Sequence, residues 1–355
     1  MPNDAIWPYR KPVACREATW QRRIMRNRLL SAALISMLSG AAHANDSVAE
    51  LGTGGIALAR SDVISMDSED LYISRDAVEV TYSFTNRSQQ DVDTLVAFPM
   101  PDIVSGLDEN VAIPDDSGDN FLGFSVEADG QEIEPTLQQR ALAGGLDVTD
   151  ELRKFGIPLF QWNDAVNPPL AALPAEVVTD FVARGILRQD MWDDGSGMQS
   201  HILPAWTLNS IYWWRMVFPA GETVEVTHRY TPSLGGTAGS VFYDGADEAF
   251  LKQIGYLDRY CIDKSFLNAV KRKQAQAGDG ALLEERLSYV LRTGASWAGS
   301  IGRFHLTVDK GSPDTLVSFC GSGVEKTGDT TFEMEIEDFY PETDLNFLFI
   351  SPADN

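Results

Sequence analysis

The fold class is indicated by one stretch, VEVTYSFTN at residues 78–86, in which apolar and polar side chains alternate. Successive residues of a strand point to opposite faces, so every second residue from Val78 to Phe84 falls on one apolar face. The turn residues Asn86-Arg87-Ser88 follow, and a second apolar run, Thr94 to Phe98, comes next. Short strands with turn signals at this spacing are typical of a β-sandwich.

The same alternation recurs further along the chain. Asp129-Gly130 predicts a tight type I′ hairpin, and further strands are expected at 206–218 and 223–230. Near the C-terminus, more alternating sets begin at Leu287, Phe304, Phe332 and Leu345. We therefore predict a mainly β protein with two β-sandwich-like regions and helical insertions.

Two stretches interrupt the alternation and predict helices. In the first, a helix begins near Thr149, and a second helical apolar face ends at Gly185, a C-capping residue. In the second, Asp263 can cap a helix whose basic C-terminal end suits the helix dipole. The predicted organisation is a leader over 1–44, an N-terminal β-sandwich domain over 45–140, a helical and irregular insertion over 141–205, and a C-terminal β domain over 206–355 with a helical insertion at 246–280.

The strands around Trp213 and Val226 could belong to either β region. A two-stranded hairpin cannot bury its apolar face alone, so these strands must join a larger sheet. We expect them to pair with the C-terminal strands of 285–309. The alternative is that they complete the N-terminal sandwich by pairing with 76–98.

The start of the chain has the three parts of a secretory signal peptide. A basic segment with Arg26 and Arg28 precedes an apolar run from Leu29 to Leu38, and the small-residue motif Ala42-His43-Ala44 follows. The apolar run is about half of the ~20 residues that a membrane span needs, so no transmembrane anchor is expected. We predict cleavage between Ala44 and Asn45.

The export signal predicts a periplasmic or secreted protein. With a signal peptide over 25–44, Met25 is the initiator. If Met1 is the initiator instead, Arg22-Arg23 offers a twin-arginine signal as the alternative.

The chain is strongly acidic, with 52 Asp and Glu against 28 Lys and Arg and a formal net charge of −24. The leader holds more basic than acidic residues, so its removal makes the mature chain more negative still. The negative electrostatic potential of such a chain repels nucleic acid and anionic lipid surfaces and attracts cations and basic partners. No nucleic-acid partner is therefore expected.

Cys261 and Cys320 are the cysteines that remain after Cys15 is removed with the leader. Two thiols in an oxidising compartment usually pair. Their disulfide would close a loop of about 60 residues, worth roughly 4 kcal/mol in the chain-entropy model. The alternative is two separately buried thiols. The sequence has no Cys-x-x-Cys motif, which argues against a redox-active pair or a zinc knuckle.

Distinct motifs are spread over nearly the whole mature chain. They include Gly54-Gly55-Ile56, Ala97-Phe98-Pro99-Met100-Pro101, Phe218-Pro219-Ala220-Gly221, Val226-Thr227-His228-Arg229-Tyr230, Tyr260-Cys261, the run from Tyr289 to Gly299, and Val317-Ser318-Phe319-Cys320-Gly321. Together they resemble a family of exported bacterial proteins, domain of unknown function 4424 (DUF4424). The resemblance implies an exported, β-rich protein with both cysteines as family features, and it implies no activity. The Phe-Pro-Met-Pro segment is also similar to inter-alpha-trypsin-type β-sandwich modules, a likeness of fold that does not fix function.

Signals for catalysis are weak. The mature histidines, His201, His228 and His305, are far apart and form no His-x-x-x-His or His-Glu-x-x-His motif. His228 lies on the apolar face of its strand and is interpreted as a hydrogen-bonded core residue, whereas His305 alternates to the polar face and is interpreted as solvated. We therefore predict no catalytic residues and no bound cofactor apart from a calcium candidate.

The calcium candidate is an Asp-rich loop that contains Asp115, Asp116 and Asp119. Calcium takes six to eight oxygen ligands, and such loops bind it weakly outside the cytoplasm. The spacing does not match the helical hand motif. A solvated loop without a metal is the alternative.

Trp206, Trp213 and Trp214 form a candidate binding surface. Neighbouring residues of a strand face opposite ways, so either Trp213 or Trp214 must be covered by the insertion, a second domain or a partner. A ligand cleft is expected between the two helical insertions, with Trp206 and the acidic segment 193–194 near its rim.

The sequence favours a soluble, non-enzymatic envelope protein that binds an unknown envelope protein or ligand. One alternative is a periplasmic hydrolase that uses acidic residues, which would place a carboxylate with a raised pKa in a deep pocket. The other is a purely structural envelope subunit, which would expose a large apolar patch.

Overall fold

The computed structural model describes residues 46–52, 55–105, 110–162, 164–193, 195, 197–236, 240–242, 247–277 and 282–353. All of them fall in one compact unit, Ala41–Asn355. The described chain is mainly β, as predicted, and its strands form four sheets. The predicted signal peptide, its cleavage site between Ala44 and Asn45, and Arg22-Arg23 lie outside the described residues.

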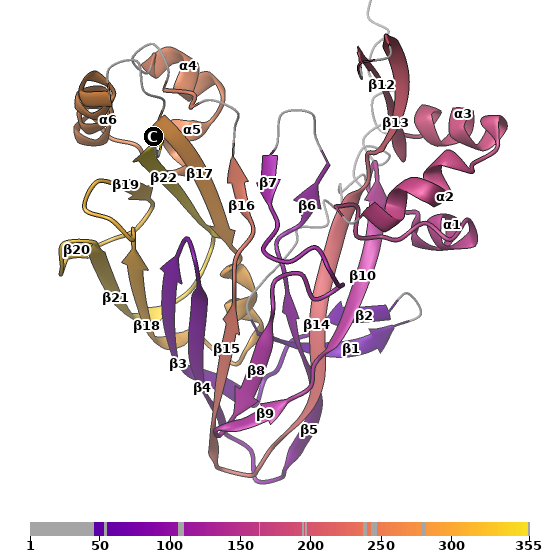
Figure 1. The fold of residues 1–355 in the computed structure, drawn as a ribbon. Coiled ribbons are helices and arrows are strands. Elements are labelled where there is room, and N and C mark those ends of the chain that lie inside the picture. The colour runs from indigo at the N-terminus through magenta and orange to yellow at the C-terminus, as the bar shows by residue number, and fades with distance from the viewer. Residues whose placement is uncertain are drawn as a thin grey trace, which may run out of the picture. The chain divides into compact units, whose positions relative to one another are not determined.

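The largest sheet has eight strands and is built around the stretch at 78–86 (Figure 1). In sheet order, the strands are β20 (Glu325–Lys326), β21 (Thr331–Phe339), β18 (Ile301–Asp309), β3 (Ile64–Ser74), β4 (Val78–Asn86), β15 (Thr223–Tyr230), β8 (Ser125–Ala128) and β9 (Gln131–Ile133). The apolar residues of β4 face the core, as the alternation predicts. The hairpin turn between β8 and β9 has positive φ at Asp129 and Gly130, which is the predicted type I′ geometry.

The prediction for the strands around Trp213 and Val226 was wrong. β15 pairs with β4, from Thr223 opposite Thr85 to Tyr230 opposite Val78, so the alternative is correct. The side chain of Asn86 adds to this pairing, because its Nδ2 donates to the carbonyls of Gln90 and Phe218, both at 2.8 Å. These bonds join the turn after β4 to the turn before β15, a long-range contact that alternation alone does not encode.

The boundary between the two predicted β domains is crossed by three of the four sheets. β18, from the predicted C-terminal domain, runs parallel to β3, from the predicted N-terminal domain. The two β regions are therefore joined by continuous hydrogen bonding rather than forming two separate domains. Alternation defines which face of a strand is buried, but not which strand lies beside it.

Three further sheets complete the β structure. A seven-stranded sheet has the order β11 (Leu146–Asp147), β10 (Thr136–Ala143), β14 (Thr207–Phe218), β5 (Val92–Pro99), β1 (Ser47–Gly52) and β2 (Gly55–Leu58), with β6 (Ile103–Val104) also paired to β14. A five-stranded sheet has the order β19 (Leu316–Phe319), β22 (Leu345–Pro352), β17 (Leu282–Tyr289), β16 (Leu234–Gly236) and β7 (Asn110–Ala112). A two-stranded sheet consists of β12 (Leu187–Asp193) and β13 (Met198–Pro204).

The helices fall mainly in the two predicted insertions. The first holds α1 (Thr149–Lys154), the 3-10 turn η1 (Asp164–Val166), α2 (Asn167–Ala171) and α3 (Ala175–Ala183). The second holds α4 (Glu248–Gln253), α5 (Tyr256–Arg259) and α6 (Lys264–Ala277), and a 3-10 turn, η2 (Arg292–Ser296), follows later. Gly185 after α3 has φ of 69°, and Asp263 Oδ1 accepts from the backbone N–H of Phe266 at 2.7 Å, so both predicted caps are confirmed. The hairpin β12–β13 within 141–205 was not predicted.

The core is divided into one large cluster and two smaller ones. The large cluster lies between the sheets, and aromatic rings from β4, β5, β14 and β15 meet in it. A second cluster packs the helices α4, α5 and α6 against Leu348 and Ile350 of β22. No helix within the described ranges is both long and apolar enough to cross a membrane.

Candidate functional site

A pocket of about 220 Å³ opens beside the second helical insertion. Its lining comes from the chain around β6 and β7, the segment that leads into β16, the end of α5, and β17. Figure 1 shows β7, β16 and β17 as neighbours, in agreement with their pairing. The lining residues are Met100, Pro101, Asp102, Ile103, Val104, Val111, Phe121, Leu122, Tyr230, Pro232, Ser233, Gly235, Arg259, Tyr260, Arg286 and Ser288.

One wall of the pocket is apolar and rigid. Met100, Ile103, Phe121 and Leu122 line it and are buried. Phe121 stacks on Phe160, with ring centroids 4.8 Å apart, so the wall continues into the main core. Side chains held in this way offer a preformed apolar surface to a ligand.

The lining also includes Arg286 of β17, whose side chain is held by hydrogen bonds. Its Nη1 donates to the hydroxyl of Tyr256 at 3.3 Å, and its Nη2 donates to the carbonyl of Gly236 at 3.1 Å. Tyr256 in turn donates to Oε1 of the buried Glu284 at 2.7 Å. This chain of hydrogen bonds ties a guanidinium of the pocket to the core beneath the helices.

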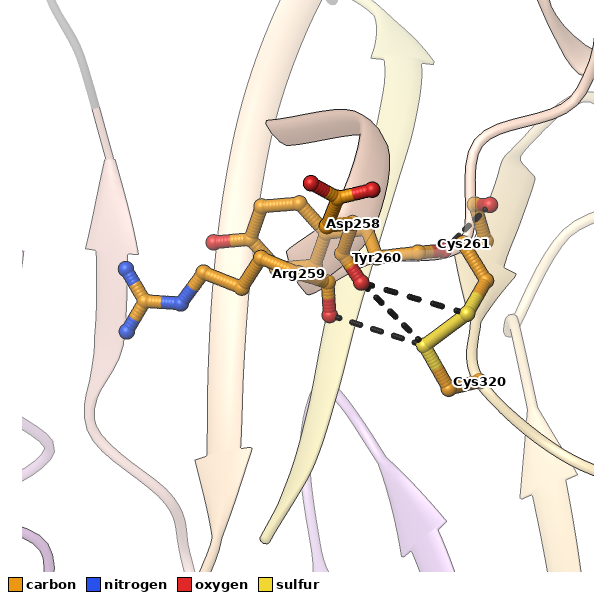
Figure 2. The surroundings of a disulfide bond; sticks show 6 residues. Asp258, Arg259, Tyr260, Cys261 and Cys320 are labelled. Carbon is orange, nitrogen blue, oxygen red and sulfur yellow. Dashed lines mark hydrogen bonds between the residues drawn. A yellow bond between two sulfur atoms is a disulfide. The ribbon is translucent and has the colours of Figure 1, made fainter. Parts of the chain in front are cut away.

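A second guanidinium, that of Arg259, reaches the pocket from the end of α5. Figure 2 shows its side chain extended away from the disulfide of Cys261 and Cys320. The two cysteine Cα atoms are 5.0 Å apart, within the range that a disulfide requires, so the structure contains the predicted bond. Ser318 Oγ also donates to the carbonyl of Tyr260 at 2.9 Å. Both links hold the end of α5, and with it Arg259 and Tyr260, against β19.

The position of the pocket differs from that of the predicted cleft. Within the described chain, the second insertion contributes to the lining through α5, whereas no residue of 141–205 does. Asp193 lies instead at the tip of the β12–β13 hairpin, where its Oδ1 accepts from the N–H of Gly195 at 2.9 Å, and residue 194 lies outside the described residues. The cleft prediction was wrong because it depended on the wrong partner for β15.

The predicted tryptophan surface was also wrong. Trp206 is fully buried and its Nε1 donates to the carbonyl of Leu159 at 2.9 Å. Trp214 is buried in the main core, while Trp213 packs half-buried on the other face of β14 against Ala49 and the rest of a small cluster. Apolar side chains therefore cover both faces of β14. Ala49 of β1 packs with Trp213, and Leu159 of the first insertion accepts the hydrogen bond of Trp206.

The three histidines do not meet. His228 is buried as predicted, among the rings of Tyr82, Phe98, Phe124 and Trp214. Its Nε2 lies 3.5 Å from Asp46 Oδ1, but neither ring nitrogen forms a hydrogen bond with a described residue, contrary to the prediction, and burial lowers the pKa of His228 to about 3. His305 Nδ1 lies 3.2 Å from Asp70 Oδ1, and His201 stacks on Trp192.

A carboxylate with a raised pKa is present, but it lies in the core and not in the pocket. Burial, and secondarily the charge of Glu69, raises the pKa of Asp46 well above its usual value. Neither residue lines the pocket, whose described lining has one carboxylate, Asp102. Asp102 Oδ1 accepts from Asn209 Nδ2 at 2.8 Å. The arrangement expected for a hydrolase is therefore not assembled by the described lining.

The acidic loop is the predicted calcium candidate, and among the described residues no three His, Cys, Asp or Glu side chains are grouped so that they could hold an ion. Asp115, Asp116 and Asp119 are all exposed. Asp115 Oδ1 accepts from the N–H of Ser117 at 2.8 Å, and hydrogen bonds to Ser117 lower the pKa of this carboxyl. Calcium binding by this loop stays a prediction.

A family model described as Domain of unknown function (DUF4424) matches residues 44–348. The chain belongs to the DUF4424 family. Among solved structures, this DUF4424 protein is similar to one titled a "putative nutrient binding protein" from Legionella pneumophila. The two share 16% identity over 86% of this chain and 72% of that chain, with a TM-score of 0.40. At this TM-score the likeness supports no argument about function. No curated protein matches the DUF4424 chain.

Sequence reasoning missed the two arginines of this DUF4424 pocket. Arg259 precedes Cys261 by two residues, so a disulfide prediction could have drawn attention to it as a residue held in place. Arg286 lies on the face of β17 opposite Leu287, a face that alternation assigned to solvent. The helices α4 and α5 and the strand β16 cover part of that face, which the sequence alone did not indicate.

Proposed function

We propose that this protein is an exported binding protein that holds a small organic molecule in the pocket between β6, β16, β17 and α5. The observation that carries the proposal is the pocket itself, whose lining combines buried apolar side chains with the guanidinium groups of Arg259 and Arg286. Apolar walls with a few fixed polar groups are typical of ligand sites. Export is supported by the leader pattern at 25–44 and by the disulfide, which persists in oxidising compartments.

A binding role is favoured over hydrolysis by the chemistry of the lining. Asp102 has no second carboxylate beside it in the described lining, and it is engaged by Asn209. General acid–base hydrolysis by carboxylates needs two such groups with different protonation states. Arginines, by contrast, remain protonated and serve recognition.

The proposal is tested by blocking the pocket at Gly235. A Cβ built at Gly235 would lie 3.7 Å from Arg286 Nε, so Gly235→Ala adds a methyl group at ordinary contact distance, whereas Gly235→Leu extends into the pocket. Ligand-observed NMR with a mixture of small metabolites should detect binding to the wild-type protein and to Gly235→Ala. Binding should be lost in Gly235→Leu with its circular dichroism spectrum unchanged. Equal binding to both variants would refute the proposed site.

A further inference from the structure

We infer that the pocket selects organic acids that have one carboxylate and an apolar body. This inference rests on the proposed function, because it names the ligand class of the same pocket. The inference rests on the partners of the charged side chains in the lining, which are Arg259, Arg286 and Asp102. Arg286 lies near a buried carboxylate of the protein, whereas no described carboxylate pairs with Arg259.

The charge of Arg286 is compensated within the protein. Its Nε lies 4.0 Å from Oε1 of Glu284, two residues earlier on the same strand face. Glu284 is buried, and its other oxygen accepts from the N–H of Val241 at 2.9 Å. Arg286 therefore acts as a fixed hydrogen-bond donor with little net charge to attract an ion.

No described carboxylate pairs with Arg259, whose guanidinium carbon lies 5.8 Å from the ring centroid of Tyr260. The Nε of Arg259 donates to the uncharged amide oxygen of Asn346 at 3.4 Å, and the guanidinium forms no ion pair within the described chain. A guanidinium has five N–H donors in a planar fork, and it binds a carboxylate through two parallel hydrogen bonds. Arg259 is thus the group that supplies both charge and geometry for a carboxylate.

The acidic background makes such a cation selective. The chain has a formal net charge of −24, which repels anions from most of its surface. Asp102 lies in the same lining and would repel a second negative charge on the ligand. Hence one carboxylate fits the lining better than two.

The apolar wall and the size of the pocket define the rest of the ligand. Met100, Ile103 and Phe121 can cover a hydrocarbon or aromatic body but cannot hydrogen-bond to it. The volume of about 220 Å³ is below the roughly 300–1,000 Å³ of drug-sized sites, so the ligand is metabolite-sized. A short aliphatic or arylalkyl monocarboxylate matches both conditions.

Calorimetric titration with phenylacetate, its uncharged analogue phenylacetamide and the dianion phenylmalonate tests the ligand class. Phenylacetate should bind saturably at millimolar concentration and at least about tenfold more tightly than either analogue, which is about 1.4 kcal/mol. Raising the salt concentration should weaken phenylacetate binding and leave phenylacetamide unaffected, because only the carboxylate meets Arg259 through charge. Equal affinity for the acid and the amide, or no saturable binding of phenylacetate, would overturn the inference.

Variants separate this inference from the proposed function. Arg259→Ala should lose about tenfold in phenylacetate affinity, and Arg259→Lys should retain part of it, because Lys keeps the charge without the fork. Arg272→Ala, which removes an exposed arginine of α6 outside the lining, is the matched control and should bind like the wild type. If Gly235→Leu abolishes binding but Arg259→Ala does not weaken it, the pocket is a ligand site and the carboxylate inference fails. If Gly235→Leu binds phenylacetate normally, both fail.

Discussion

The indole N–H of Trp297 donates to the backbone carbonyl of Asp46 at 2.7 Å, with both residues buried. Asp46 immediately precedes β1, and Trp297 follows the 3-10 turn η2, so the bond joins the beginning of the described chain to its C-terminal third. Ser47 Oγ and Ser296 Oγ, 2.9 Å apart, add a second link at the same place. The start of the described chain is therefore part of the core.

Replacing Trp297 by Phe should lower the free energy of unfolding. The change leaves the buried carbonyl of Asp46 without this donor, for which we expect a cost of about 1–3 kcal/mol. Urea unfolding followed by circular dichroism measures the change. Trp213→Phe, at a half-buried indole, should have a smaller effect, and an equal effect of the two substitutions would contradict this account.

Export should produce a mature N-terminus at Asn45. The expectation comes from the motif Ala42-His43-Ala44, and the burial of Asp46 and Ser47 limits how far cleavage could move into the chain. Intact-mass spectrometry of protein recovered from the bacterial envelope gives the answer. A protein that retains Met1 or Met25 would rule out this processing.

The buried amide of Asn86 should be intolerant of a change to a carboxylate. Asn86→Asp removes the amide N–H donor to the carbonyls of Gln90 and Phe218 and puts a carboxylate oxygen, which repels these carbonyl oxygens, in its place. We therefore expect the free energy of unfolding to fall by about 2–5 kcal/mol. Thermal unfolding compared with Ser88→Ala, a half-buried neighbour in the same turn, measures the effect. A similar melting temperature for the two variants would show that the turn-to-turn contact is dispensable.

Burial of His228 should make stability depend on pH. Its pKa is lowered from 6.5 to about 3 in the folded protein, so between these values the unfolded chain binds a proton that the folded chain does not. The free energy of unfolding should therefore fall as the pH drops through this window, by up to about 1.4 kcal/mol per pH unit, with no contribution above it. Asp46 acts in the opposite direction, because its raised pKa lets the folded state take up a proton first as the pH falls.

The difference between the wild type and His228→Phe measures the titration of His228 together with its effect on Asp46, whose Oδ1 lies 3.5 Å from His228 Nε2. Phe suits the surrounding rings of Tyr82, Phe98 and Trp214 and does not titrate. In urea unfolding at several pH values between about 4 and 7, the stability of the wild type relative to His228→Phe should be constant near neutral pH and fall as the pH drops below about 6.5. Parallel curves over the whole range would mean that His228 is not the titrating group.

Loss of the disulfide should weaken both the fold and the pocket. Cys261→Ser with Cys320→Ser releases the end of α5, which carries Arg259 and Tyr260, and removal of a native disulfide typically costs 2–5 kcal/mol. Melting temperature and phenylacetate affinity should both decrease. The double variant should not respond to a reducing agent, whereas the wild type should. An unchanged affinity would show that α5 is held by its other contacts.

The local structure could be predicted from the sequence far better than the partners of each strand. The burial of β4, the turn at Asp129-Gly130 and the cap at Asp263 depend on neighbouring residues, so periodicity and capping rules found them. The pairing of β15 with β4 joins residues about 140 positions apart, from Thr223 opposite Thr85 to Tyr230 opposite Val78, and no local pattern encodes it.

The candidate site was harder to predict for the same reason. Trp206 and Trp214 looked like surface residues because the elements that cover them are distant in sequence. Arg259 and Arg286 meet at one pocket only after α5 folds over β17, and a short strand with polar residues on one face does not reveal that cover. The disulfide was predictable, because the number of cysteines and the compartment left few choices.

The parallel pairing of β3 with β18 brings together two strands that are synthesised at very different times. Ser68 of β3 faces Arg303 of β18, and the connection between them includes most of the chain. Because the chain is synthesised from its N-terminus, β3 is made long before β18 and cannot pair with it until synthesis is nearly complete. Contacts between residues so far apart in the sequence form slowly. Until β18 is present, the unpaired edge of β3 can pair with other chains and aggregate. The edge of β3 that pairs with β18 therefore stays open until the last third of the chain has been made.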